Sequence, residues 1–328
     1  MRRAAQAAAF WVQWGGAALA LPLAVALTGE PRGDTVITGA VIYTLDPVRP
    51  RASALVIRGG RIAYVGDEAG ARAAAGRDAR IFALSGGMVL PGFHDSHIHP
   101  MSGGLRLIRC RLGDAKGAAQ VYAAVRACAA AHPKDPWVLG SGWAPEALAP
   151  ERASLAKLDE LVPDRPAFLT TEDGFSAWIN SRALAAAGIE ARRGAPTGIV
   201  EDEAAKRIRR AIPPPGSDQY REALRRATAI ANGFGITSLV DANATPAMLD
   251  AYRAADTAGE LTVRVVAAQR VDAERGVEQV AEMAERRDRA KAGAFVPMAP
   301  NSFSTARSIA IPPPCSHLTP IYLASAAR

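Results

Sequence analysis

The sequence predicts an α/β protein in which a small β unit precedes a partial, TIM-like (β/α)8 barrel. Three observations support this fold class. Residues 34–90 contain short β-branched segments separated by glycine pairs, a pattern typical of hairpins. From residue 91 onward, strand-like segments alternate with helical ones, as in a parallel sheet covered by helices. Between these regions an apolar strand leads into three histidines within six residues, at positions 94, 97 and 99.

Size and composition indicate a globular protein with a sizeable core. The chain has 328 residues, of which 49% are hydrophobic and 22% charged. Its net charge is +7, but no basic run is interleaved with aromatic residues, so we expect a solvated basic surface and no nucleic-acid partner. Cys110, Cys128 and Cys315 are odd in number and widely spaced. We therefore expect no disulfide framework, and interpret them as free thiols or small buried side chains.

Residues 1–30 differ from the rest of the chain. Arg2 and Arg3 precede a weakly apolar stretch over residues 7–27, with small residues near position 24. This pattern is typical of a secretory signal peptide and predicts export to the periplasm or the extracellular space. An uncleaved membrane anchor and an over-extended start codon are the alternatives, and without a signal the protein would be cytoplasmic. No later segment is long and apolar enough to span a bilayer, so we expect no other membrane domain.

The expected elements follow in chain order. Turn residues and β-branched runs predict strands at residues 35–42, 54–57, 61–65, 80–84, 88–90, 137–139, 167–170, 236–241 and 261–267. Helical periodicity predicts helices at residues 67–75, 118–131, 155–161, 181–187, 218–232, 246–258 and 273–291. Ser154 is the expected N-cap of the third helix, and Gly188 is expected to end the fourth.

The histidine-rich segment is the strongest candidate for a functional site. In an extended strand Asp95, His97 and His99 point to one face, and Pro100 ends the strand. The cluster would then lie at the strand's C-terminal end, where the catalytic groups of a β/α barrel gather. Two imidazoles two residues apart can bind a metal ion, and Asp95 is expected to orient a ligand or the strand end. A pair of solvated histidines before a proline turn is the alternative.

This segment also carries a resemblance. The pattern P-G-F-x-D-S-H-x-H at residues 91–99 resembles the first barrel strand of the metal-dependent amidohydrolase superfamily. Residues 34–47, 137–143, 164–184 and 233–242 resemble its branch called amidohydrolase family 3, or YtcJ-like. The resemblance covers roughly residues 34–298. It implies a β-sandwich part at 31–90 and an incomplete amidohydrolase barrel at 91–298.

The resemblance further implies hydrolysis assisted by one or two divalent metal ions, with zinc expected, held by His97, His99 and later ligands. Metal-activated water would cleave an amide or other non-peptide C–N bond of a small-molecule substrate. Five positions match segments from which substrate contacts are expected: Trp143, Asp173, Gly174, Asn180 and Asp202. Each could instead be a cap, turn or packing residue. Phe175 stands where the family commonly has histidine, and Asp241 ends a predicted strand and could line the pocket.

Residues 299–328 form an aberrant tail, rich in serine, proline and alanine and without an acidic residue. The simplest interpretation is a disordered terminus. The second is a reading-frame shift, because moving the frame back one base from Asn301 permits K-L-F-L-D-G and later H-T-A-A-M-L-A-P-Y, which resemble the family's next segments. In that case Cys315 and His317 are accidental. The metal-bridging lysine and the general-base aspartate implied by the resemblance would then be absent from this chain.

Three functions remain open at this point. The first is a metal-dependent hydrolase, and the second is a catalytically inactive, truncated amidohydrolase remnant lacking the later metal ligands. The third is an exported binding protein. A serine or cysteine hydrolase is disfavoured, because G-x-S-x-G is absent and no cysteine accompanies a histidine in a catalytic context. An incomplete barrel would leave an unpaired strand edge, which favours a need for partners and a possible homo-oligomer.

Overall fold

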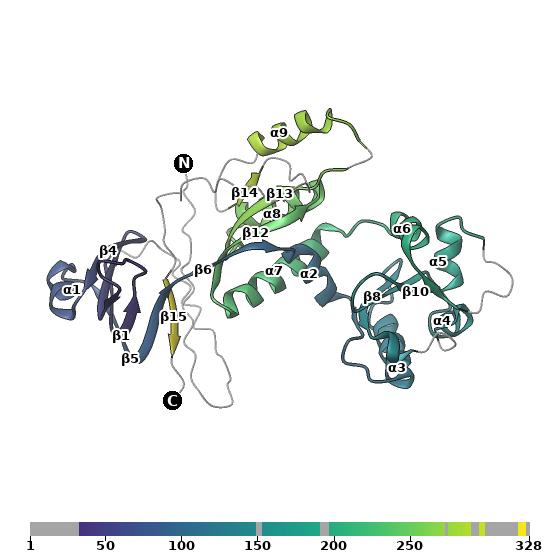
Figure 1. Ribbon diagram of the computed structural model, residues 1–328, viewed down its shortest axis with the longest axis horizontal. Helices are drawn as coiled ribbons and strands as arrows, with labels where there is room; N and C mark the ends of the chain where they lie inside the picture. The colour runs from purple at the N-terminus through teal and green to yellow at the C-terminus, as the bar shows by residue number, and fades with distance from the viewer. Residues whose placement is uncertain are drawn as a thin grey trace. The chain divides into compact units, whose positions relative to one another are not determined.

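The computed structural model describes residues 33–148, 153–190, 197–272, 275–289, 295–298 and 321–325 (Figure 1). The predicted signal segment lies outside these residues, as does most of the tail. The chain divides into two compact units, one drawn from Met1–His99 and Ala227–Arg328 and the other formed by Pro100–Arg226. The first unit is therefore discontinuous in sequence, and the second is inserted between its two parts.

The first unit begins with an open, mixed sheet of six strands in the order β15-β5-β1-β3-β4, with β2 paired to β1. Its strands are β1 (Thr35–Tyr43), β2 (Arg51–Ala52), β3 (Ala54–Arg58), β4 (Arg61–Gly66), β5 (Arg80–Pro91) and β15 (Ile321–Ser325). Only the β1–β5 pair is parallel. The two predicted strands at 80–84 and 88–90 are one continuous strand.

Side-chain alternation gives this sheet two apolar faces. Ile37 and Leu55 belong to one buried cluster, whereas their neighbours Val36 and Val56 belong to another. Helix α1 (Glu68–Ala74) contributes Ala71 to the second cluster. The described residues thus form a single sheet packed by a helix, and a two-sheet sandwich stays a prediction.

The other sheet of this unit has four parallel strands in the order β14-β13-β12-β6. They are β6 (Phe93–Ile98), β12 (Ile236–Ala244), β13 (Arg264–Gln269) and β14 (Phe295–Met298), and the chain between them forms α8 (Pro246–Thr257) and α9 (Gln279–Arg289). Gly92 separates β5 from β6. A Cβ at this position would overlap the side chain of Thr237 on β12. Only glycine therefore allows the chain before β6 to approach β12.

The second unit is built on a five-stranded sheet in the order β11-β10-β9-β8-β7. Its strands are β7 (Cys110–Arg111), β8 (Val138–Trp143), β9 (Ala167–Thr171), β10 (Ala177–Ile179) and β11 (Ile199–Val200). Its helices are α2 (Pro100–Ile108), α3 (Ala118–Ala131), α4 (Leu155–Leu161), α5 (Ser181–Ala186) and α6 (Asp202–Ala211), with the short η1 (Pro145–Ala147). Helix α7 (Ser217–Gly233) contains the boundary between the units.

Two separate cores stabilise the second unit. Helices α3 and α4 bury Val121, Val125 and Leu158 in one cluster with Trp143 and Trp178. The other cluster contains residues of α5 and α6 together with Trp137, Phe168 and Ile179: Ala183, Leu184 and Ile208. Phe168 and Leu169 are adjacent on β9 but belong to different clusters, so the two cores lie on opposite faces of the sheet.

The predicted (β/α)8 barrel is not confirmed, because all three sheets are open among the described strands. Strand–helix alternation shows that parallel pairing occurs but does not say which strands pair. Predicted barrel strands β8 and β9 pair with each other, whereas β6 pairs with β12.

Helices α2 and α6 were not expected. Pro100, interpreted as the end of a strand, is also the first residue of α2, where its missing N–H costs no hydrogen bond.

Within the tail, Ile321–Ser325 is described and forms β15, antiparallel to β5. Of the helices in the described ranges, none has the length and apolarity needed to cross a bilayer.

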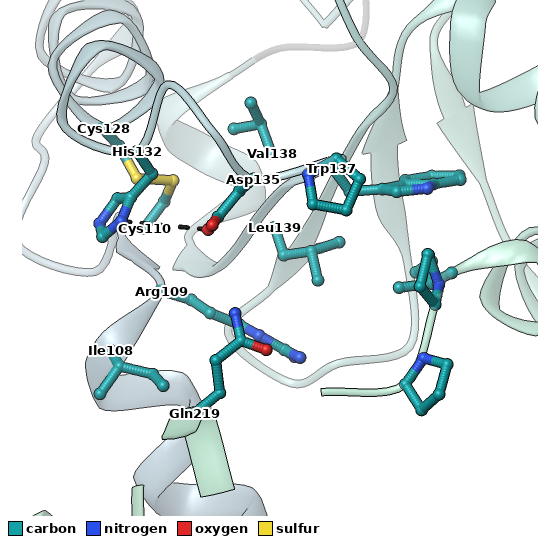
Figure 2. Close-up of a pocket in the computed structure, with 14 residues that line it drawn as sticks. Ile108, Arg109, Cys110, Cys128, His132, Asp135, Trp137, Val138, Leu139 and Gln219 are labelled. Carbon is teal, nitrogen blue, oxygen red and sulfur yellow. Dashed lines mark ion pairs between the residues drawn. A yellow bond between two sulfur atoms is a disulfide. The ribbon is translucent and has the colours of Figure 1, made fainter. Parts of the chain in front are cut away.

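The expectation that the cysteines are unpaired was wrong. Cys110 on β7 and Cys128 on α3 form a disulfide, with their Cα atoms 5.5 Å apart (Figure 2). Spacing alone concealed this pair, because the third cysteine made the number odd and connectivity depends on how β7 packs beside α3. The bond closes a loop of 18 residues next to the first core of the second unit.

This disulfide should stabilise the second unit. Closing a loop of this length typically contributes about 2–4 kcal/mol by restricting the unfolded chain. We expect the double substitution Cys110→Ser and Cys128→Ser to lower the free energy of urea unfolding by that amount. Dithiothreitol should lower it similarly in the wild type but leave the double variant unchanged. Cys315→Ser is the control and should behave as wild type. Equal stability of the wild type with and without reductant would contradict the pairing.

Candidate functional site

The candidate site lies where β6 ends. The carboxylate of Asp95 accepts a hydrogen bond from the backbone N–H of His97, with Asp95 Oδ1 and His97 N 3.1 Å apart. This contact fixes the backbone that carries the histidines. The Asp95 carboxylate thus lies at the strand end and accepts from the main chain.

The two imidazoles of the motif contact each other. The ring centroids of His97 and His99 are 5.4 Å apart, with an interplanar angle of 79°. His97 lies at the carboxyl end of β6 and His99 directly follows it. Residues two apart in an extended strand point to the same face, which brings the two rings together. About 46% of the His99 side chain is exposed, so its ring is open to a ligand from solvent.

A buried carboxylate from the neighbouring strand completes this cluster. Asp241 on β12 lies opposite Ile98 in the parallel ladder, next to His99. Its Oδ1 atom is 3.9 Å from His99 Nδ1, an ion-pair distance. Only 2% of the Asp241 side chain is exposed. An imidazole whose Nδ1 faces a carboxylate presents Nε2 to a ligand, the arrangement in which metal-binding histidines are commonly held.

Asp241 is held in turn by Tyr252 and by its own strand. The Tyr252 hydroxyl on α8 donates to Asp241 Oδ2 over 2.8 Å, and the N–H of Asn243 donates to Oδ1 over 3.2 Å. Burial raises the pKa of Asp241, while these two hydrogen bonds and the nearby His99 act to lower it. Burial and the adjacent carboxylate raise the pKa of Tyr252 well above its usual value. Tyr252 therefore stays a hydrogen-bond donor.

The chemistry of this donor set fits part of a metal site. Two imidazoles and an orienting carboxylate are suitable for a divalent ion such as zinc, but a tetrahedral shell needs four ligands. Within the residues that the structure describes, no group of three or more His, Cys, Asp or Glu side chains could hold a metal ion. His97 and His99 would supply two of the four ligands, and their role as metal ligands stays a prediction.

The predicted substrate residues all lie in the second unit, and two of them make structural contacts. Trp143 is 2% exposed, and its Nε1 donates to the Leu169 carbonyl over 2.8 Å. Asn180 is fully buried, and its Oδ1 accepts from the N–H groups of Ala183 and Ala167. Asn180 is thereby the N-cap of α5. Trp143 thus has the packing role, and Asn180 the helix-capping role, that the sequence left open as alternatives to substrate binding.

The other three predicted residues lie near loops of this unit. Asp173 accepts hydrogen bonds from the Thr171 hydroxyl and the Phe175 N–H, which lower its pKa. Gly174, with φ of +78°, lines a pocket described below. Asp202 is the first residue of α6, where a carboxylate favours the helix dipole. Their substrate-binding role stays a prediction.

Two pockets occur within the second unit. The first, of about 70 Å³, lies beside the disulfide and includes His132, whose Nδ1 is 3.9 Å from Asp135 Oδ2 (Figure 2). His132 is the C-cap of α3, and its backbone N–H donates to the Cys128 carbonyl. The second pocket, of about 200 Å³, is lined by Gly174 and by three arginines that the sequence did not single out: Arg106, Arg109 and Arg209.

Sequence reasoning found both histidines and named Asp241, but it missed Tyr252. The available signal was an aromatic residue with a polar tip on a helix directly after β12, because a buried tyrosine hydroxyl usually finds a partner. The three arginines carried no comparable signal, since Arg106 and Arg109 lie in and just after α2, whereas Arg209 lies far away in sequence, in α6.

Comparisons with known proteins agree with the resemblance. The family model described as "Amidohydrolase family" matches residues 80–316, beyond residue 298 where we placed the end of the resemblance. The chain is 31% identical over 221 residues to the protein LONG AFTER FAR-RED 3 of Arabidopsis thaliana, covering 63% of this chain and 38% of that protein. It is 28% identical over 251 residues to the N-substituted formamide deformylase of Arthrobacter pascens, covering 70% and 46%.

A solved structure shows the same fold. It is an uncharacterized metal-dependent hydrolase from Pyrococcus furiosus, with a TM-score of 0.62 and 25% sequence identity, covering 77% of this chain and 52% of that chain. The chain spans 38–51% of the length of the curated relatives that it matches.

The first prediction for this site concerns the Tyr252–Asp241 hydrogen bond. Tyr252→Phe leaves a buried carboxylate with one donor fewer, so we expect the free energy of unfolding to fall by about 1–3 kcal/mol. Tyr43→Phe is the matched control, because the Tyr43 hydroxyl has no hydrogen bond to a described residue. Chemical denaturation of both variants measures the difference. Equal stability of the two would contradict the role given to Tyr252.

The second prediction concerns pH. The folded protein holds the proton of Asp241 more tightly than the unfolded chain, because burial raises the pKa of this carboxyl. The resulting stabilisation is complete below the unfolded pKa, about 3.9, and is lost as pH rises through the folded pKa. We therefore expect the stability of the wild type, relative to Asp241→Asn, to decrease as pH rises from about 4. Thermal melts of both proteins across that range test this. If the stability of the wild type relative to Asp241→Asn increased with pH, the prediction would be contradicted.

Proposed function

The chain belongs to the amidohydrolase family, and from this premise we propose that it is a metal-dependent hydrolase. Its proposed substrate is a small molecule in which an amide or another non-peptide C–N bond is cleaved. One observation carries the proposal: His97 and His99 lie together at the end of β6, beside a buried carboxylate on the adjacent parallel strand. The similarity to an N-substituted formamide deformylase supports this bond class.

In this proposal each described residue has a defined task. His97 and His99 are the two metal ligands from this strand, and Asp241 holds the His99 ring through Nδ1. Tyr252 keeps Asp241 in place. A divalent ion at these imidazoles would polarise the scissile carbonyl and lower the pKa of a bound water. We assign no general base, because the described residues offer none with a supported role.

Further properties belong to the proposal as well. Zinc is the first metal to test, since imidazole ligands suit it and a protein of this fold is named as a metal-dependent hydrolase. Export through the N-terminal segment and assembly into a homo-oligomer remain proposals from the sequence. A catalytically inactive remnant is the alternative, favoured by the absence of a three-ligand group among the described side chains.

The prediction that tests this function is metal content. We expect the purified full chain to hold about one or two divalent ions, measured by mass spectrometry of the metals. His97→Ala and His99→Ala should each lose at least about tenfold in metal affinity, because each removes one of the few ligands. His94→Ala is the matched control: it lies on the same strand, but alternation directs its side chain to the opposite face.

Activity is measured in parallel on a panel of N-substituted formamides and acylated amines. Turnover that is abolished by a chelator and restored by zinc would support the hydrolase. Metal retention by all three histidine variants would reject the assignment of the ligands. A chain without metal and without turnover would favour the inactive alternative.

A further inference from the structure

The second pocket of the Pro100–Arg226 unit is lined by three arginines. It encloses about 200 Å³, room for a small molecule of several atoms. Strands β8 and β9 and helices α2 and α6 supply much of its lining, and Arg109 follows the end of α2. Its lining residues are Arg106, Arg109, Leu139, Gly140, Ser141, Phe168, Thr170, Gly174, Arg209 and Ile212. We call it the arginine pocket.

Two guanidinium groups meet at one side of this pocket. Arg209 Nη2 donates to the Gly174 carbonyl over 3.0 Å, and the Arg209 guanidinium lies 5.1 Å from the centroid of the Phe168 ring. A methyl group added at Gly174 would lie 3.5 Å from Arg106 Nη2. Arg106 and Arg209 therefore both lie beside Gly174. The Phe168 ring packs against the Arg209 guanidinium.

The third arginine extends from the chain just after α2. Arg109 lines both pockets, and Figure 2 shows its side chain with Gln219 in the first one. Burial lowers the pKa of Arg109, while Tyr220 and Asp135 oppose this shift from a distance. Burial, and after it the charge of Arg106, lowers the pKa of Arg209. Arg109 and Arg209 thus lose solvation, and Arg106 repels Arg209.

In the arginine pocket itself no carboxylate faces these charges, while Asp135 acts on Arg109 from a distance. The lining residues of the pocket include no aspartate or glutamate. Among the described residues, neither Arg106 nor Arg109 has a hydrogen bond or an ion pair. The nearest predicted site carboxylate in sequence is Asp173, and it accepts from Thr171 and Phe175 instead. Protein surfaces usually pair or fully solvate such charges, so three clustered arginines without an acid favour an anionic ligand.

The neutral groups of the pocket suit the same ligand. Ser141 brings a hydroxyl from β8, while the Thr170 hydroxyl on β9 donates to the Gly140 carbonyl over 3.3 Å. Leu139, Phe168 and Ile212 give the pocket an apolar part. A concave site with apolar walls and a few convergent polar groups is typical of small-molecule binding. A basic surface for a nucleic acid would instead be open and extended.

We propose that the arginine pocket binds a small molecule through an oxyanion, a phosphate or carboxylate group held by Arg106, Arg109 and Arg209. Planar guanidinium groups recognise both of these anions through paired hydrogen bonds. Ser141 contributes a hydroxyl, and the apolar part takes the remainder of the molecule. All residues of this pocket belong to the second unit, whereas His97 and His99 belong to the first.

The test is calorimetric titration of the full chain with inorganic phosphate, and separately with malonate, at a constant ionic strength set with chloride. We expect saturable binding of one anion per chain. Arg209→Met and Arg106→Met should each weaken it by about tenfold or more, since each removes charged hydrogen bonds to the ligand. Comparison of the two probes identifies whether phosphate or carboxylate is the preferred group.

Arg210→Met is the matched control. Arg210 is the next residue on α6, is exposed and pairs with Glu203 at 3.9 Å, and its loss changes the net charge equally. Binding should be unchanged in this variant. Arg106→Met separates loss of binding from misfolding, because the Arg106 side chain makes no hydrogen bond to a described residue that the substitution could remove. The proposal is overturned if neither anion binds saturably, or if Arg210→Met weakens binding as much as Arg209→Met.

Discussion

The parallel pairing of β6 with β12 is the constraint on which the candidate site depends. Adjacent strands lie about 4.8 Å apart, so residues at their carboxyl ends become neighbours. The observed register places Asp241 opposite Ile98, and thus beside His99. A bulky residue at position 92 would push the strands apart at Thr237, close to the start of this ladder. The geometry of the imidazoles therefore rests on a glycine outside the site.

This pairing joins segments separated by the whole second unit. A flexible chain of that length would close at a modest entropic cost, because the cost grows only with the logarithm of loop length. Here the intervening Pro100–Arg226 has its own sheet, two apolar cores and a disulfide. It can therefore fold from its own contacts. This explains how a long insertion is compatible with a short, well-defined strand pair.

Local features of the sequence predicted local structure well. Ser154 caps α4 by accepting from the N–H of Lys157, and Gly188 follows the end of α5 with a positive φ. The H-x-H motif placed two imidazoles together, because strand alternation depends on nothing beyond the strand itself. These inferences needed only neighbours within a few residues.

The features that the sequence did not predict are all long-range. Alternation of strands and helices could not separate β8 and β9 from β6 and β12, since the same pattern is produced by one barrel or by two sheets. The disulfide depended on how β7 packs beside α3. The Tyr252–Asp241 contact depended on how α8 returns along β12. Each needed a tertiary contact that periodicity does not record.

The two sites have opposite electrostatics, and this contrast bears on function. Asp241 is a carboxylate buried beside imidazoles, and its charged form is disfavoured by burial. A cation at His99 would stabilise that charge. The arginine pocket holds cationic groups without a carboxylate, and an anion would stabilise them in the same way. A cation would therefore act on a buried carboxylate that already accepts two hydrogen bonds, whereas an anion would act on arginines that are exposed or half-buried. In both sites the favourable contribution of a ligand comes from its charge, which is opposite to that of the protein groups.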